Sequence, residues 1–211
     1  MAEMSMNKVI HAAIRRDLDR FVTALQNFPV GDAARARQLG KAWDNFDDQL
    51  TYHHEGEHEI AWPALASVGV SQDVLTTMDT EHEAMAKALA TTDAAMNAVV
   101  LSPSKEKVDP ALAAMTELRS VTLAHLDHEE TEIEQVYLDK RDTPQIQAMG
   151  KAFGKVSPAR GGRFFSWVLD GATPQEQQTV KEMGVPAPVL SMLTGIFGRG
   201  YRKDVASVWR S

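Results

Sequence analysis

The sequence predicts an all-α protein, an antiparallel up-down-up-down four-helix bundle followed by a C-terminal extension of short helices. Apolar residues recur at three- and four-residue spacing through most of the chain, while period-2 alternation of β-branched residues is scarce. Four long periodic segments are separated by short or moderate loops, which favours antiparallel neighbours. We expect the bundle to occupy residues 1–142 and the extension residues 143–211.

Turn residues bound each helix of the predicted bundle. The first three helices are expected over residues 7–28, 33–67 and 72–101, separated by Pro-Val-Gly-Asp and Val-Gly-Val-Ser. The fourth is expected over residues 110–139, because Pro110 follows an aspartate and proline suits the first helical position.

The extension carries shorter helix signals, from which we expect three or four helices. Thr-Pro and Ser-Pro pairs predict helix starts at Pro144, Pro158 and Pro174, the last with a capping box between Thr173 and Glu176. Glycines predict turns at Gly161-Gly162, Gly171 and residues 184–186.

Composition excludes several classes of protein. With 211 residues and 44% hydrophobic content the chain can bury a full core. Cysteine is absent, which excludes thiolate zinc sites, iron–sulfur clusters and disulfides, so any metal must be held by nitrogen and oxygen. No apolar run approaches 20 residues, so we expect a cytoplasmic protein with no membrane partner.

Charge is unevenly distributed. The net charge of −7 disfavours nucleic acid as a partner. Residues 1–150 carry 13 Lys and Arg against 25 Asp and Glu, a net −12, whereas residues 151–211 carry 9 against 4, a net +5. The basic extension is therefore expected to pack against the acidic bundle, and a protein partner or a homodimer through the extension is a further prediction.

Two polar pairs interrupt the apolar stripes of the expected bundle. His53 and Glu57 lie on the stripe of the second helix, and His125 and Glu129 on that of the fourth. Residues four apart share one helix face, so each His-x-x-x-Glu pair points inward. An unpaired buried carboxylate costs several kcal/mol, so a metal ion or a buried salt bridge must compensate it.

An internal repeat relates these pairs. His53 to His125 and Glu57 to Glu129 are both 72 residues, and His11 to His82 is 71. At a rise of about 1.5 Å per residue, these positions lie at the same height along the bundle axis to within two helical turns. Six candidate metal ligands result: His11, His53, Glu57, His82, His125 and Glu129.

This set suits two ions related by an approximate two-fold axis. Each ion would take two histidines, both carboxylates would bridge, and one position on each ion would remain open for a small ligand. Iron, manganese and zinc all accept imidazole and carboxylate. His54, His58 and His128 fall beside the stripes, so we expect them to be neighbours rather than ligands, although each remains an alternative.

As an ordered set these motifs resemble the hemerythrin-like, or HHE cation-binding, family. The resemblance rests on His11 in IHAAIRRDL, the pair in HHEGEHEIAWPAL, His82 in EHEAM and the pair in HLDHEETEI, and it covers about residues 8–139. It implies an antiparallel four-helix bundle with a non-haem di-iron centre that meets O2, peroxide or nitric oxide.

The chain departs from the oxygen-carrying hemerythrins, whose third helix supplies His-x-x-x-His. Ala86 stands four residues after His82, and Glu129 replaces the more distant Asp of their fourth helix. One imidazole fewer predicts a harder, more exposed site, which favours chemistry on a bound oxidant over reversible O2 carriage.

We therefore predict two oxo- or hydroxo-bridged iron ions that decompose peroxide, in a catalase- or peroxidase-like reaction, with Glu57 and Glu129 as the catalytic residues. The alternative is a non-catalytic module that senses O2, nitric oxide or iron. A third possibility is a metal-free structural protein.

Overall fold

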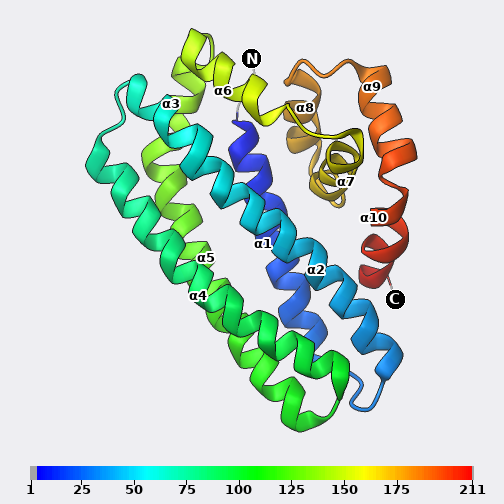
Figure 1. The fold of residues 1–211 in the computed structure, drawn as a ribbon. Helices are drawn as coiled ribbons and strands as arrows, with labels where there is room; N and C mark the ends of the chain where they lie inside the picture. Colours follow the sequence, from blue (N-terminus) through cyan, green and yellow to red (C-terminus); the bar gives the residue numbers. More distant parts are fainter. Residues whose placement is uncertain (1–3, 211) are drawn as a thin grey trace.

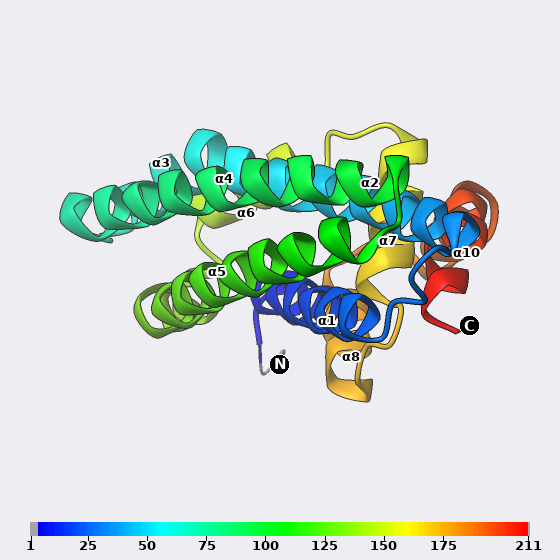
Figure 2. The same ribbon diagram turned by 90° about the horizontal axis from the view of Figure 1, so that it is seen from below.

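Four long helices dominate the computed structural model, which describes residues 4–210. They are α1 (Met6–Gln26), α2 (Ala33–Gly56), α4 (Gln72–Leu101) and α5 (Lys105–Lys140). Helix α4 packs against α5 and α2, and α1 packs against α5 and α2, so the four close into a helical bundle (Figures 1 and 2). Every regular element of the described residues is helical, which confirms the all-α prediction.

The bundle buries two apolar clusters. The larger one surrounds Phe21, Trp43 and Phe46, all fully buried. The smaller one lies at the opposite end of the long helices and includes Leu65 and Ile133. Side-chain caps fix the helix starts as expected, since Ser5, Asp32 and Ser71 each accept a hydrogen bond from a first-turn amide.

The fourth long helix starts earlier than the sequence predicts. Helix α5 begins at Lys105, and Pro110 lies inside it. Because proline has no amide hydrogen, the helix lacks the bond to the Glu106 carbonyl at this point. The additional turn buries Val108, which is 5% exposed, and this apolar contact offsets the lost hydrogen bond.

The second expected helix, residues 33–67, is not continuous. After α2 come a π-helical turn, η1 (Glu57–Ala61), and a short helix, α3 (Trp62–Ser67). The Trp62 amide donates to the Glu57 carbonyl, five residues back. Pro63 cannot donate to the carbonyl of residue 59, so the regular α-helical ladder is interrupted here and the backbone widens by one residue.

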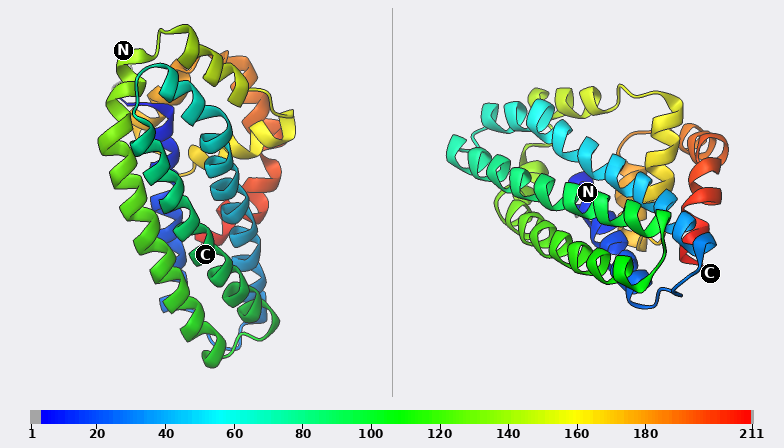
Figure 3. Two further views of the ribbon diagram at one scale, coloured as in Figure 1. Left: turned by 60° about the vertical axis from the view of Figure 1, so that its left-hand side comes forward. Right: turned by 60° about the horizontal axis from the view of Figure 1, so that its bottom comes forward.

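The C-terminal residues form helices that cover one side of the bundle and one of its ends (Figure 3). In order they are α6 (Pro144–Phe153), α7 (Pro158–Val168), α8 (Pro174–Glu182), α9 (Ala187–Met192), η2 (Leu193–Phe197), α10 (Arg199–Asp204) and η3 (Ala206–Trp209). This exceeds the three or four helices expected. The starts at Pro144, Pro158 and Pro174 and the capping box of α8 are confirmed.

One predicted turn is wrong. Gly161 and Gly162 lie inside α7, not between helices. A Cβ atom on Gly162 would lie 2.4 Å from the Cβ of Phe197, so glycine here permits η2 to pack directly on α7. The turns at Gly171 and Gly184 are confirmed by their φ angles of +83° and +82°.

Ion pairs and buried polar contacts join these helices to the bundle. Helices α7 and α8 pack on α1, α10 and η3 pack on α2, and α6 packs on α3 and η1. Arg160 pairs with Asp48 at 3.3 Å and Lys41 with Asp204 at 3.0 Å. Only the Arg160–Asp48 pair has the predicted polarity, since in the Lys41–Asp204 pair the bundle supplies the cation. The division of the chain at residue 142 stays a prediction.

Asp17 of α1 is the most deeply buried of these contacts, at 1% exposure. Its carboxylate accepts hydrogen bonds from the indole Nε1 of Trp167 at 2.8 Å and from Arg20 Nη1 at 3.0 Å. The bond from Trp167 connects the first helix to a residue 150 positions away in the sequence.

We expect Asp17→Ala to lower the free energy of unfolding by about 3 kcal/mol, because it leaves the buried indole N–H of Trp167 without its acceptor and removes one of the two carboxylates that Arg20 contacts. Urea denaturation measures the change. Asp19→Ala is the matched control: Asp19 is 59% exposed and pairs with Arg119 on the surface, so about 0–1 kcal/mol is expected. Equal losses in the two variants would refute this role for Asp17.

Candidate metal centre

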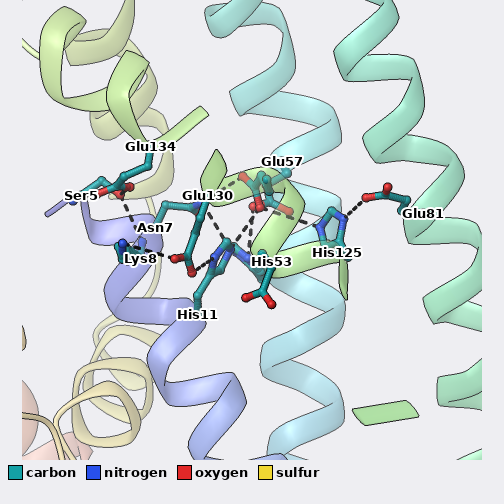
Figure 4. A network of polar contacts seen from close by, with 12 residues as sticks. Ser5, Asn7, Lys8, His11, His53, Glu57, Glu81, His125, Glu130 and Glu134 are labelled. Atoms are coloured by element: carbon teal, nitrogen blue, oxygen red, sulfur yellow. Dashed lines mark hydrogen bonds and ion pairs between the residues drawn. The ribbon is translucent and has the colours of Figure 1, made fainter. Parts of the chain in front are cut away.

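The six predicted ligands meet in the interior of the bundle, at the π-helical turn. Figure 4 shows four of them, His11, His53, Glu57 and His125. Each long helix contributes: His11 comes from α1, His53 from α2, Glu57 from η1, His82 from α4, and His125 and Glu129 from α5. Five of the six are less than 9% exposed, and the side chain of His82 is 10% exposed. The helices therefore bring together side chains that are up to 118 residues apart in the sequence.

The ligand atoms fall into two groups that share Glu57. Within each group, atoms lie within 4.8 Å of one another. One group is His11, His53, Glu57 and Glu129, and the other is His54, Glu57, His82 and His125. Glu57 Oε1 lies 3.1 Å from His53 Nε2, and its Oε2 lies 3.3 Å from His82 Nε2. One carboxylate thus faces both groups, one oxygen to each.

Glu129 is placed less symmetrically than the repeat predicts. Its Oε2 lies 3.1 Å from His11 Nε2 but 3.8 Å from His125 Nε2, and it belongs to one group only. Its Oε1 accepts a hydrogen bond from Asn7 Nδ2 at 2.9 Å. The sequence reasoning missed Asn7, although it lies four residues before His11 on the same helix face.

The donor atoms fit a cation. Buried atoms without a hydrogen bond gather here, namely His53 Nε2, His54 Nε2, both oxygens of Glu57 and Glu129 Oε2. Such orphaned polar atoms are costly unless something binds them. His82 Nε2 and His125 Nε2 lie 3.0 Å apart, and two nitrogens bound at right angles to one ion at about 2.1 Å are separated by about 3 Å.

His54 lies in the second ligand group, although the sequence predicts that it is only a neighbour of the site. Its ring stacks on His82 with the centroids 4.2 Å apart, whereas the neighbouring His53 meets His11 edge-on at 5.3 Å. Consecutive helix residues point about 100° apart, and α2 contacts both α4 and α1. Both histidines can therefore reach the interior, each toward a different helix.

This position also changes the count of imidazoles and the symmetry. The two groups together contain five histidines, one more than the predicted set; His11, His53 and His125 are buried, and His54 and His82 are partly buried. The position 72 residues after His54 is Leu126, a buried core residue. The two-fold relation therefore holds for His53 and His125, which lie in different groups, but not for Glu57 or His54.

The other two uncertain histidines lie outside both groups. His58 is 68% exposed, and its Nδ1 lies 3.1 Å from Asp79. His128 Nδ1 lies 2.8 Å from Glu81 Oε1. Neither ring reaches the shared carboxylate of Glu57.

Comparison with known families agrees with this geometry. The family model described as the hemerythrin HHE cation binding domain matches residues 7–137, more than half of the chain. The chain belongs to the hemerythrin HHE family. No curated protein and no solved structure shows a match to it. None of its described helices is long and apolar enough to cross a membrane.

The matched segment of this HHE protein ends at residue 137, within α5. The resemblance predicted from the motifs is thereby confirmed, and the family accounts for a cation-binding helical bundle. Helices α6 to η3 lie outside the match.

Two further carboxylates orient the histidines of the HHE site. Glu130 Oε1 lies 3.1 Å from His11 Nδ1, and Glu81 Oε2 lies 2.8 Å from His125 Nδ1. A carboxylate accepts a hydrogen bond from the Nδ1–H of each ring, so the Nε2 atom of each ring faces the centre. Arg15 donates to Glu130 and fixes it. Burial opposes ionisation, but hydrogen bonds from His11 and Arg15 lower the pKa of Glu130 to about 2.

Three imidazoles of the site, those of His53, His54 and His82, have lowered pKa values. Burial, together with the neighbouring histidines, holds the pKa of His53 and that of His54 well below the usual range. Burial likewise lowers the pKa of His82 to about 4. These rings are therefore neutral at neutral pH, with nitrogen lone pairs free to bind a metal.

The two carboxylates of the HHE centre differ in their proton affinity. Burial and the charge of Glu129 raise the pKa of Glu57 well above its ordinary value. Burial acts against the ionisation of Glu129, but His11 beside it lowers its pKa to about 2. Burial alone would lower the pKa of His11, and the carboxylates of Glu129 and Glu130 raise it. Among these groups, the metal-free HHE protein therefore raises the proton affinity of Glu57 and of His11.

We expect Glu81→Ala to weaken metal binding by about 10- to 100-fold, because His125 loses the acceptor that orients its ring. Competition with a chelator measures the affinity. Glu83→Ala, an exposed glutamate two residues away on α4, is the matched control and should bind metal as the unmodified protein does. An unchanged affinity in Glu81→Ala would show that the helix backbone alone orients His125.

Proposed function

We propose that this chain is a non-haem di-iron protein that decomposes peroxide, in a catalase- or peroxidase-like reaction. The observation that carries the proposal is the Glu57 carboxylate, whose two oxygens face different ligand groups and make no hydrogen bond. Nitrogen and oxygen donors on four facing helices are an established way to build a dinuclear centre. The proposal includes the antiparallel arrangement of these helices that the sequence predicts.

Bound iron would supply the redox chemistry with peroxide. The chain's own residues set the conditions for it. The Nε2 atoms of His11 and His125 face the centre because carboxylates hold their Nδ1–H groups outward. Burial of Glu57 and Glu129 excludes bulk water, which strengthens every charge interaction at the site. Glu57 and Glu129 are thus the proposed catalytic residues.

The test uses purified protein reconstituted with iron. Elemental analysis should find about two irons per chain, and peroxide added in excess should be consumed. Glu57→Ala should abolish consumption, whereas His58→Ala, a substitution at an exposed histidine outside both ligand groups, should retain it. Protein that binds two irons and leaves peroxide untouched would refute the proposed reaction.

The alternative is a sensor that binds O2, nitric oxide or iron without turnover. The contact of α6 with η1 favours it, because a change at the metal centre has a route to the helices outside the family match. Ligand-dependent protease susceptibility of residues 143–211, without peroxide consumption, would support this alternative. A protein partner or a second copy at these helices stays a prediction.

A further inference from the structure

One contact connects the C-terminal helices directly to the metal centre. Gly56 is the last residue of α2, and it precedes the shared ligand Glu57 by one position. The ring of Phe153, at the end of α6, lies directly against it. A Cβ atom on Gly56 would lie 2.5 Å from Phe153 Cε1, closer than real Cβ atoms approach a neighbour. The glycine is therefore required by the close approach of this ring.

The backbone at this point needs support from outside. The π-helical turn η1 is closed by a bond from the Trp62 amide to the Glu57 carbonyl, and π turns are rare and occur mostly as single turns inside α-helices. Both ends of the turn touch the site. Glu57 provides the shared carboxylate, and the Trp62 ring stacks on His82 with the centroids 5.8 Å apart. A shift of η1 would move both.

Helix α6 is the element that packs on this turn. It contacts η1 and α3, and Ile146 of α6 lies in the apolar cluster that also contains Trp62. Phe153 packs at the edge of the same cluster. Because α6 lies beyond residue 137, this support is not part of the matched HHE segment.

We propose that Phe153 is a positioning residue, which holds the π turn so that the Glu57 carboxylate lies between the two ligand groups. The inference rests on the proposed metal-binding function. The C-terminal extension then completes the metal centre, although none of its side chains belongs to either ligand group.

Hydrogen exchange of the metal-free chain tests the positioning without any metal. In Phe153→Ala the amides of residues 57–62 should exchange about 10-fold faster or more, while core amides of α1 keep their rates. Phe153→Leu should restore slow exchange, because it keeps an apolar side chain on Gly56. Phe164→Ala is the matched control, since Phe164 is also partly buried but packs on the other apolar cluster. Unchanged exchange in Phe153→Ala overturns the inference.

Gly56→Ala gives a second test, in which the direction of the change in hydrogen exchange decides. In an unconstrained helix this change would stabilise the backbone. If Phe153 occupies the space, Gly56→Ala should instead accelerate exchange of residues 57–62, and in the Phe153→Ala background it should have little further effect. Slower exchange in Gly56→Ala alone overturns the inference.

Iron binding completes the experiment. The affinity for Fe(II), measured under anaerobic conditions by competition with a chelator, should fall about 10- to 100-fold in Phe153→Ala and stay unchanged in Phe164→Ala. If the unmodified chain binds no iron, the proposed function fails and this inference fails with it. If the unmodified chain binds two irons and Phe153→Ala binds them as tightly, only the positioning role is refuted.

Discussion

Glu57→Gln should release both metal ions and at the same time stabilise the metal-free chain. Each oxygen of Glu57 faces a different ligand group, so a neutral amide lowers the metal affinity of both groups. We expect a loss of about 100-fold or more, because loss of a residue that only orients a ligand already lowers affinity by about 10- to 100-fold. Without metal, the buried carboxylate has no hydrogen bond, and replacing it removes a desolvation cost of at least about 1 kcal/mol. Metal content and urea denaturation should therefore change in opposite directions.

The pH dependence identifies the cause of the stabilisation. The pKa of Glu57 is raised in the folded chain, so the folded state binds the proton more tightly than the unfolded state does. This contribution to stability is fully present below the ordinary glutamate pKa and is lost as the pH rises toward the raised value. The advantage of Glu57→Gln should therefore be small near about pH 4.5 and larger near about pH 7.5.

Glu55→Gln is the matched control for this prediction, because Glu55 is exposed and lies two residues away. It should change neither metal content nor stability. Retention of two ions by Glu57→Gln would mean that the carboxylate is not shared between them.

His54→Leu should reduce the metal content from about two ions to about one. It removes one of the three imidazoles of the group His54, His82 and His125, while the group around His11 and His53 keeps all its members. Leucine is chosen because Leu126 occupies the position related by the repeat and packs in the core. Elemental analysis after exchange against a chelator measures the ratio.

Two further variants serve as comparisons for His54→Leu. His53→Leu should also leave about one ion, but in the other group, so the double variant should retain none. His58→Leu, at a 68% exposed position, should retain both. Two ions in His54→Leu would exclude His54 as a ligand and restore the site of six residues that the sequence predicts.

His54→Leu should also reduce acid sensitivity of the metal-free chain. The pKa of His54 is lowered in the folded state, so the unfolded state binds more protons below the ordinary histidine pKa, and stability falls as the pH drops through that region. Leucine removes this contribution.

The sequence determined much of the fold and the site. Period 3.6 located the long helices, because a helix that packs on one side must place apolar residues on one face. The same periodicity revealed His53, Glu57, His125 and Glu129 as polar residues on apolar faces, and the similar spacing of 71 residues between His11 and His82 added the first and third long helices. The structure brings all six of these side chains together.

Other features depend on contacts between distant residues. His54 lies off the mean apolar face, and only the packing of α2 against two neighbours brings it inward. Helix α5 begins at Lys105, before Pro110, because the additional turn buries the side chain of Val108 in the core. The π turn at Glu57 follows from Pro63 together with the packing of α6, which is why the sequence predicts a continuous helix there.

The sequence by itself therefore determined which residue types face the interior and at what level, since these follow from local helix geometry. Only the tertiary structure decided how the ligands divide into two groups around one shared carboxylate. The reason is physical: periodicity reports the average face of a single helix, whereas a metal site depends on atoms of four helices within a few ångströms. Phe153 shows the same limit, because its contact with Gly56 spans almost 100 residues of sequence.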